Sequence, residues 1–275
     1  MNGLHDLVNN SKAKATRGDI SIGCFLLSAS SFIAETMAHH PLDWMVIDME
    51  ASHASKKDLL HILQALNAYD ITPVVRVSSH DKHLIESSLD FGARGIVVPK
   101  VDTAAQAGEA TSACFYPPRG NRGINCIRAS AFYTRAKQYF DRANDSTLLI
   151  VQIESSESVD NVFEIADVPN VDVLFMGPGD LAASYGQNGV VTGPVMDRAR
   201  GRVLKACRRS GKIAGIFAHN VESANQYIDE GFTFIAIGND IKYLSLGLTL
   251  SLSHLKRPKG FRQGTPGAAT GGERK

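Results

Sequence analysis

Short apolar runs alternate with amphipathic stretches along most of the chain. The runs are rich in Ile and Val and nearly continuously apolar, which is typical of strands that are covered on both faces. They cover residues 20–27, 44–49, 72–77, 95–100, 148–154, 171–177, 212–218 and 232–238. Between them, apolar residues recur with helical spacing, and several of these stretches close on a glycine, as helix C-termini often do. The pattern predicts repeated strand–helix units.

Eight such units in 275 residues predict one domain, a single (β/α)8 TIM barrel over residues 1–256. An open, doubly wound sheet is disfavoured because no G-x-G-x-x-G turn follows the first apolar run. Residues 257–275 are rich in Gly, Pro and basic side chains and lack apolar periodicity. We therefore expect a disordered tail there.

Composition and charge exclude several classes of protein. With 29 Lys and Arg against 28 Asp and Glu, the chain has no net field that would attract nucleic acid or an anionic membrane. No apolar run approaches the roughly 20 residues that span a bilayer, and the N-terminus lacks the apolar core of a signal peptide. We expect a soluble, cytoplasmic protein. The cysteines share no C-x-x-C pair, which favours buried free thiols over zinc ligands or disulfides.

Polar side chains gather where predicted strands end. In a barrel, functional residues lie where each strand runs into the following loop. These positions hold Asp48, Glu50, Arg76, Gln152, Glu154 and Asp180. Two carboxylates on adjacent strands, Glu154 and Asp180, suit a hard divalent cation that prefers oxygen ligands. A cation and an arginine together would stabilise the negative charge that develops on an enolate oxygen.

The residues alone leave a second interpretation open. A lone Glu or Asp at a strand end is often a helix cap or a surface group, and Asp180 fits the start of a helix at DLAAS. Arg76 is harder to explain in this way, because a buried arginine needs a partner. The residues indicate a barrel enzyme with an acidic site and leave the metal open.

Six segments of the chain resemble the HpcH/HpaI aldolase family. They read LDWMVIDME, PVVRVSSHD, LDFGARGIVVPKVDTAAQA, YPPRGNRG, LIVQIES and VDVLFMGPGDLAASYG. The resemblance implies a phosphoenolpyruvate/pyruvate-type barrel and a class II pyruvate aldolase, a metal-dependent carbon–carbon lyase. Such an enzyme acts on a 2-oxo acid through a pyruvate enolate and has an aldehyde as its second partner. Mg²⁺ is the expected ion, with Mn²⁺, Co²⁺ or Zn²⁺ as alternatives.

The resemblance also assigns residues to the metal and to catalysis. Glu154 and Asp180 match the metal-binding carboxylates of the family. Arg76 matches the arginine that stabilises the pyruvate enolate. Asp90 matches an acidic residue that a neighbouring subunit supplies to support a catalytic histidine.

Further matches concern the substrate and the assembly. Gln152 matches a residue near the substrate, and Phe25 falls where the family often has an aromatic residue. Pro178 and Gly179 match the turn that receives the pyruvate carboxylate. The resemblance implies a homo-oligomer, a hexamer or a trimer, built by exchange of the last helix at 239–253.

One departure from the family pattern concerns the base. The family's second strand ends in Asp-x-Glu-His, and that His acts as general base, whereas this chain has Ala51 there. Alanine cannot carry a proton. Three interpretations remain open. In the first, His53 replaces the base. In the second, the enolate forms by decarboxylation of oxaloacetate, as in the macrophomate synthase branch, so that metal and Arg76 suffice. In the third, His53 is an ordinary loop residue in an enzyme of altered activity.

Other candidates rank below these residues. His219 follows the seventh strand directly and is the second histidine candidate, and Arg119 and Arg122 are candidates for binding an acidic substrate tail. A non-catalytic barrel that binds a keto acid is the remaining class of function. It is disfavoured because a scaffold has no evident reason to keep two carboxylates and Arg76 at one rim.

Overall fold

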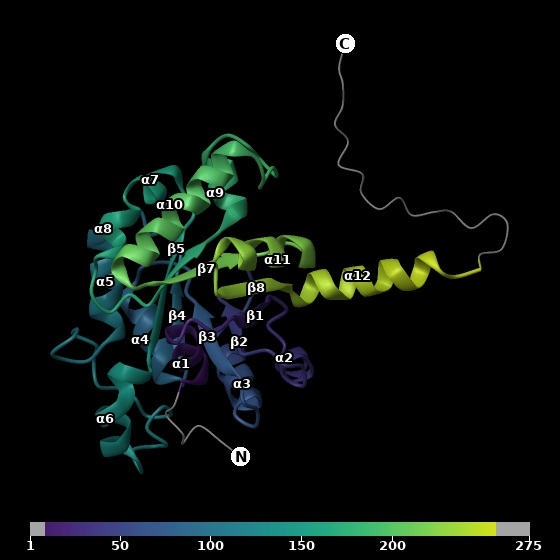
Figure 1. Ribbon diagram of the computed structural model, residues 1–275. Helices are drawn as coiled ribbons and strands as arrows, with labels where there is room; N and C mark the ends of the chain where they lie inside the picture. The colour runs from purple at the N-terminus through teal and green to yellow at the C-terminus, as the bar shows by residue number, and fades with distance from the viewer. Residues whose placement is uncertain (1–8, 257–275) are drawn as a thin grey trace.

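The computed structural model describes residues 9–256, which form a closed barrel of parallel strands surrounded by helices (Figure 1). The strands pair in chain order, and β8 closes onto β1. They are β1 (Ser21–Leu26), β2 (Trp44–Asp48), β3 (Thr72–Arg76), β4 (Gly95–Val98), β5 (Leu148–Ile153), β6 (Val173–Met176), β7 (Ile213–Phe217) and β8 (Phe234–Asn239). The predicted barrel is confirmed. The expected tail at 257–275 lies outside the described residues.

Most of the helices follow strands and cover the outside of the barrel, whereas the first precedes β1 and the last extends away from the barrel (Figure 1). The helices are α1 (Asn10–Thr16), α2 (Ser31–Ala38), α3 (Lys56–Leu66), α4 (Lys82–Asp90), α5 (Ala104–Cys114), α6 (Ala136–Ser146), α7 (Ser156–Asp160), α8 (Val162–Ala166), α9 (Pro178–Ser184), α10 (Pro194–Ser210), α11 (Val221–Glu230) and α12 (Asp240–Ser253). Their ends follow local sequence. In α11, Asn220 and Ser223 form a capping box, and Gly231 ends the helix in the left-handed conformation.

The long connection between β4 and β5 differs from the sequence prediction. The sequence ASAFYTRAKQYFDRAND at 129–145 predicts one helix over its whole length, yet α6 begins only at Ala136. Ala131, Phe132 and Tyr133 take φ values of 55°, 56° and 65°, which no right-handed helix accommodates. The short helix α1 is an addition that the pattern of apolar residues did not indicate, and α9 begins two residues before the DLAAS helix that was one interpretation of the sequence.

Every second strand residue points into the barrel and contributes to its interior core. Trp44 and Phe234 stack there with ring centroids 4.1 Å apart. Gly23 makes this packing feasible, because a Cβ at that position would lie 2.0 Å from the Trp44 ring. The outward residues pack against the helices in a second core. This alternation decides which side chains emerge into the open end of the barrel.

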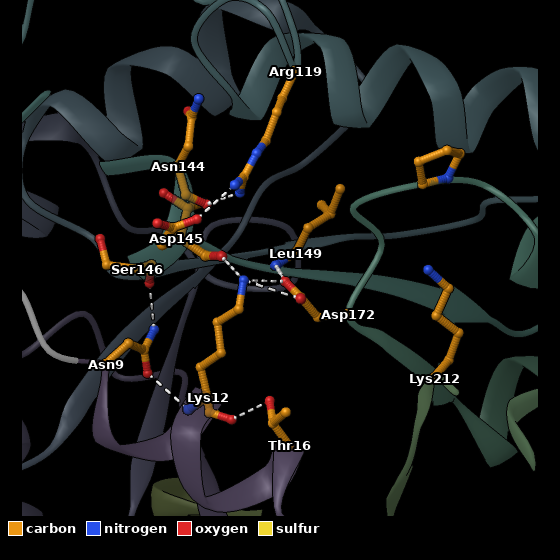
Figure 2. Close-up of polar contacts among 12 residues, drawn as sticks. Asn9, Lys12, Thr16, Arg119, Asn144, Asp145, Ser146, Leu149, Asp172 and Lys212 are labelled. Atoms are coloured by element: carbon orange, nitrogen blue, oxygen red, sulfur yellow. Dashed lines mark hydrogen bonds and ion pairs between the residues drawn. The ribbon is translucent and has the colours of Figure 1, made fainter. Parts of the chain in front are cut away.

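The amino-terminal end of the barrel is closed by α1. Figure 2 shows Lys12 reaching from α1 to Asp172, with 3.0 Å between nitrogen and oxygen. Lys12 also donates to the carbonyl of Thr147, and the Asn9 amide donates to the carbonyl of Ser146 at 2.9 Å. A ligand therefore reaches the interior from the opposite end, where the strands terminate.

Two further expectations concern the thiols and membranes. The four cysteines are buried and free, which confirms the prediction. Burial raises the pKa of Cys24, Cys114 and Cys207 to about 12, so these thiols stay protonated at neutral pH. Within residues 9–256, no helix combines the length and the apolar character that crossing a membrane requires.

Candidate active site

A cavity of about 220 Å³ opens at the carboxyl ends of the strands. Seven of the eight residues that the family resemblance placed in the site line it: Phe25, Arg76, Gln152, Glu154, Pro178, Gly179 and Asp180. They come from three strands, β1, β3 and β5 with the residue after it, and from the first turn of α9. The carboxyl end of the strands is where barrel enzymes hold their catalytic residues.

Arg76 is fixed in the cavity wall. It is the last residue of β3 and points inward, and it donates to both carboxylate oxygens of Asp48, at 3.0 and 2.6 Å. Its other terminal nitrogen lies 3.2 Å from Glu50 and 3.5 Å from the Gln152 oxygen. Its guanidinium carbon lies 5.1 Å from the ring centre of Phe25. These partners leave the guanidinium a single orientation.

The charge of Arg76 is permanent. Burial opposes the charge, but the hydrogen bonds and negative charge of Asp48, with the charges of Glu50 and Glu154, outweigh burial and raise the Arg76 pKa. Asp48 itself is fully buried, so the pair is screened from water. The cavity thus always contains one positively charged guanidinium, paired with carboxylates behind it.

Glu154 lies one residue beyond β5, is 4% exposed and has a partner for each oxygen. One oxygen accepts from the backbone N–H of Lys100 at 2.8 Å, and the other accepts from the Gln152 amide at 2.9 Å. Gly177 packs directly on this carboxylate, because a Cβ there would lie 2.6 Å from Glu154 Oε2. The position of Glu154 is therefore set by three neighbours.

The protonation of Glu154 is balanced near neutral pH. Burial, and then the negative charges of Asp180 and Glu50, raise its pKa to about 7, against the opposing effects of the Lys100 N–H and of Arg76. A carboxylic acid that is half charged at neutral pH gains from a nearby cation. The electrostatics of the site favour a bound positive ion.

Asp180 is the third residue of α9, and the structure corrects one interpretation of it. Gly177 is the N-cap of that helix and no side chain caps it, so Asp180 does not cap a helix at DLAAS. It is exposed and lines the same cavity as Glu154. In the described part of the chain, no three or more His, Cys, Asp or Glu side chains are grouped closely enough to hold a metal ion by themselves. Two carboxylates fit Mg²⁺, which commonly keeps several waters and takes further oxygens from substrate.

The loop after β2 turns away from the cavity. Asp48 accepts from the backbone N–H groups of Glu50 and Ala51, at 3.0 and 3.2 Å, and the hydroxyl of Ser52 donates to the Asp48 carbonyl. Ala51 and His53 are both exposed, and neither lines the cavity. His53 instead acts electrostatically on Asp58 at the start of α3. The structure therefore separates His53 from the other predicted site residues.

Asp90 is the other predicted residue that lies apart from the cavity. It ends α4 and pairs with Arg122 at 2.5 Å in a buried contact. Burial raises the pKa of Asp90 against the opposing charge of Arg122. Arg119 pairs with Asp145 at 2.6 Å, and neither arginine lines the cavity. Both arginines brace the segment between α5 and β5.

Several lining residues were not expected from the sequence. Leu27, Phe175 and Phe217 add apolar wall, and Asn239 lies at the end of β8. Phe175 and Phe217 continue the inward series of β6 and β7, so strict alternation along each strand would have revealed them. His219, which the sequence did offer as the second histidine candidate, lines the cavity too and extends the β7 series by one more inward position.

The fold and the site together define a (β/α)8-barrel enzyme with an acidic, arginine-walled cavity at the carboxyl ends of its strands. The profile of the HpcH/HpaI aldolase/citrate lyase family matches residues 21–245, and the chain belongs to this family. It is accordingly an enzyme of the carbon–carbon lyase class. The family resemblance noted in the sequence is confirmed.

Individual relatives agree with this assignment. A 2-keto-3-deoxy-L-rhamnonate aldolase from Shigella boydii serotype 4 (strain Sb227) is 38% identical over 260 residues, which cover 94% of this chain and 97% of the relative. A crystal structure of a family member from Burkholderia cenocepacia J2315 has a TM-score of 0.86 and 35% identity, covering 90% of this chain and 98% of that one. The structure of macrophomate synthase has a TM-score of 0.78 and 26% identity, covering 91% and 88%.

Proposed function

We propose that this enzyme is a metal-dependent aldolase that cleaves a 4-hydroxy-2-oxo acid into pyruvate and an aldehyde. The observation that carries the proposal is the meeting of Arg76, Glu154 and Asp180 in one cavity at the carboxyl end of the barrel. The 38% identity to a 2-keto-3-deoxy-L-rhamnonate aldolase supports a sugar-derived 2-oxo acid as the class of substrate.

The side chains have separate roles in this proposal. Glu154 and Asp180 would hold the divalent cation, Mg²⁺ first, which when bound supplies positive charge beside the developing enolate oxygen. Arg76, held rigid by Asp48, supplies a second positive charge that needs no reorganisation during the reaction. Gln152 holds Glu154 in place through its amide.

The walls of the cavity orient the substrate and exclude water. Phe25 contributes an apolar surface beneath Arg76. Pro178 and Gly179 form the opening turn of α9, and a Cβ at Gly179 would meet no atom within 4 Å. We place the substrate carboxylate against this open turn, where backbone N–H groups at a helix start favour an anion.

A second function is favoured by the loop after β2. His53 would serve as base only after this loop rearranges, since it is exposed and outside the cavity lining. Decarboxylation of oxaloacetate forms the same enolate without removing a proton from carbon. The likeness to macrophomate synthase, at 26% identity, supports an enolate-forming decarboxylase or condensing enzyme as the alternative.

One experiment separates these functions. The purified protein is incubated with Mg²⁺, Mn²⁺ or Co²⁺, and two signals are followed: exchange of the C3 protons of pyruvate in D₂O, and release of CO₂ from oxaloacetate. Proton exchange supports the aldolase, and decarboxylation without exchange supports the alternative. The Glu154→Ala and Asp180→Ala variants should lose metal binding. Stoichiometric binding retained by both variants would contradict the assignment of the metal site.

We further propose that the chain assembles as a homo-oligomer, a trimer or hexamer, through α12. This helix extends away from the barrel (Figure 1), and its apolar side chains face solvent, Leu244 at 64%, Leu248 at 56% and Leu250 at 61% exposure. An apolar cavity of about 670 Å³ lies beside its first turn, lined by residues such as Met37 and Tyr243. Exposed apolar surface of this extent marks a protein interface.

A further inference from the structure

The proposed aldolase needs a group that moves a proton, and the inference that follows rests on that function. The ionisable side chains that line the cavity in the described chain are Arg76, Glu154, Asp180 and His219. Arg76 is permanently charged and bound to Asp48, so it cannot exchange a proton. The two carboxylates are assigned to the cation. His219 is the lining group whose chemistry is not yet used.

The barrel geometry directs His219 into the cavity. Inward residues alternate along β7 as Ile213, Gly215 and Phe217, and the next inward position is His219. In a closed order of eight strands, β7 is four strands from β3 in either direction, so it faces β3 across the barrel. His219 therefore lies across the cavity from Arg76, and Glu154 follows β5, midway between them.

A row of rings connects the two sides of the cavity. The His219 ring lies 5.2 Å from the Phe217 ring, at an angle of 70°. Phe217 lies 5.6 Å from Phe25, and the Arg76 guanidinium carbon lies 5.1 Å from the Phe25 ring centre. Edge-to-face packing of this kind fixes ring orientation. The imidazole is therefore linked to the arginine on the opposite side of the cavity through one continuous row of packed rings.

The backbone of His219 is also held. The ammonium group of Lys242, in the first turn of α12, donates to the His219 carbonyl. The backbone N–H of Lys242 donates to the side chain of Asn239 at 2.8 Å, which caps that helix. Asn239 lines the cavity as well. Contacts with the first turn of α12 thus help to fix the position of the His219 side chain.

The imidazole of His219 is not committed to a structural hydrogen bond. Its Nε2 is shielded from solvent and has no hydrogen-bond partner within residues 9–256. By contrast, Nε2 of His80 lies 2.6 Å from the Pro99 carbonyl, and that of His39 lies 3.1 Å from the Tyr69 hydroxyl. A buried polar atom without a partner is uncommon and is explained when a ligand completes the site.

We propose that the imidazole of His219 is the proton-transfer group of this enzyme. It would replace the family's histidine, whose position is occupied by Ala51 in this chain. In cleavage, the imidazole takes the proton of the substrate's 4-hydroxyl group. The C3–C4 bond then breaks, its electron pair becomes the enolate of pyruvate, and the oxygen on C4 becomes the aldehyde carbonyl. The imidazolium returns its proton to C3, so the side chain ends neutral and no oxidant or reductant is consumed.

The charge state of His219 suits this role. Burial, and then the positive charge of Lys242, lower its pKa, so the ring is neutral at pH 7 and free to accept a proton. The same two effects destabilise the imidazolium, which favours release of the proton to carbon. The other charged groups that line the cavity are Arg76, Glu154 and Asp180, on β3, after β5 and on α9.

The test compares asparagine variants at three histidines. His219→Asn is the variant of interest, His53→Asn tests the rival base, and His61→Asn on the exposed side of α3 is the matched control. Exchange of pyruvate C3 protons is followed by NMR with Mn²⁺ present. Binding of Mn²⁺ and of oxalate, a planar anion shaped like the enolate, is measured separately by calorimetry. His219→Asn should lose about 100-fold in exchange rate while both binding affinities remain.

A rescue measurement excludes a purely structural role. Added imidazole should restore exchange to a His219→Gly variant, because the removed ring leaves a space of its own size beside the cavity. Exchange by His219→Asn within threefold of wild type would overturn the inference, whatever His53→Asn does. Wild-type protein that decarboxylates oxaloacetate without exchange would also overturn it while leaving the metal site intact. Absence of both reactions in wild type would instead defeat the proposed function itself.

Discussion

At the scale of single residues, the site is built from charges that the fold forces close together. Asp48 is fully buried against Arg76, and Glu154 is nearly so beside Asp180. Burying such groups is costly unless each has partners, and both Arg76 and Glu154 have hydrogen-bond partners within 3.0 Å. Side chains held in this way need little reorganisation when substrate charge develops.

The raised pKa of Glu154 makes metal affinity depend on pH. Above about pH 7 the carboxylate is free for a cation, and below it a proton competes for the same oxygens. We expect the apparent affinity for Mg²⁺ to fall by up to about tenfold for each pH unit below 7. Calorimetric titration between pH 5.5 and 8.5 measures this, and an affinity that is flat across this range would contradict it.

Without metal, the same group acts on stability in the opposite direction. In the unfolded chain the Glu154 carboxyl group loses its proton near pH 4.5, whereas in the folded protein it keeps its proton up to about pH 7. The contribution of Glu154 to stability is therefore present below pH 4.5 and is lost as the pH rises through 7. The apparent stabilisation by added Mg²⁺ should be largest above pH 7.

Gly177 should tolerate no side chain. Its Cβ would lie 2.6 Å from Glu154 Oε2, so Gly177→Ala must displace the carboxylate or the turn that carries Asp180. We expect at least a tenfold loss of Mn²⁺ affinity, measured by calorimetry. Gly108→Ala, at a helical position where a Cβ meets no atom within 4 Å, is the matched control and should bind normally. Normal binding by Gly177→Ala would show that Glu154 is not the ligand.

Sequence alone located the charged residues of the site but ranked His219 only as the second histidine candidate, behind His53. Arg76, Gln152 and Glu154 stand out because polar residues at the end of an apolar strand are unusual. His219 stands two residues beyond its strand, where a loop side chain can point anywhere, so only the alternation of β7 and the ring contact with Phe217 fix its direction. His53 shows the converse, since its nearness in sequence to Ala51 did not bring it to the cavity.

At the scale of elements, the strands were more predictable than the helices. All eight strands fall within the predicted apolar runs or one residue beyond them, because burial on both faces leaves a continuous apolar signal. The short α1 carries no comparable signal in the apolar pattern. In segment 129–145, the left-handed residues from Ala131 to Tyr133 prevent a helix, so α6 begins only at Ala136. The pattern of hydrophobic residues does not reveal such backbone conformations.

The exposed apolar face of the last helix, α12, is expected to be an interface between copies of the chain. Leu246 on α12 is 52% exposed, and we expect it to be covered by another copy of the chain. Leu246→Asp should shift the protein from oligomer to smaller species in size-exclusion chromatography with light scattering, since a buried charge is unfavourable. Ser245→Asp, also exposed on α12, adds the same charge at a polar position and should leave the assembly intact. Unchanged mass for Leu246→Asp would refute assembly through this face.

At the scale of the whole molecule, the two ends of the barrel divide stability from chemistry. The amino end is sealed by α1 and its contacts to loops that precede β4, β5 and β6, and the carboxyl end carries the cavity. Changes at the sealed end should therefore alter unfolding without altering catalysis.

Asn9 is the position to test this division. Its side chain donates to the carbonyls of Arg94 and Ser146, both at 2.9 Å, and accepts from the Lys12 N–H. Asn9→Ala should lower the free energy of unfolding by about 2 kcal/mol, from the cost of leaving buried groups unpaired. Turnover at 25 °C should be unchanged. Asn10→Ala, which loses one exposed hydrogen bond to Asp70, should change stability far less.

The contact of Lys242 with the carbonyl of His219 joins the helix proposed for assembly to the residue proposed for proton transfer. Dilution that separates the copies would release α12 and loosen this anchor. Specific activity should then decline at low protein concentration, and heat tolerance should decline with it, as mass action requires. In an enzyme arranged in this way, the activity per chain depends on the concentration of the protein itself. Unassembled chains at low concentration are slow, and assembly at higher concentration activates them.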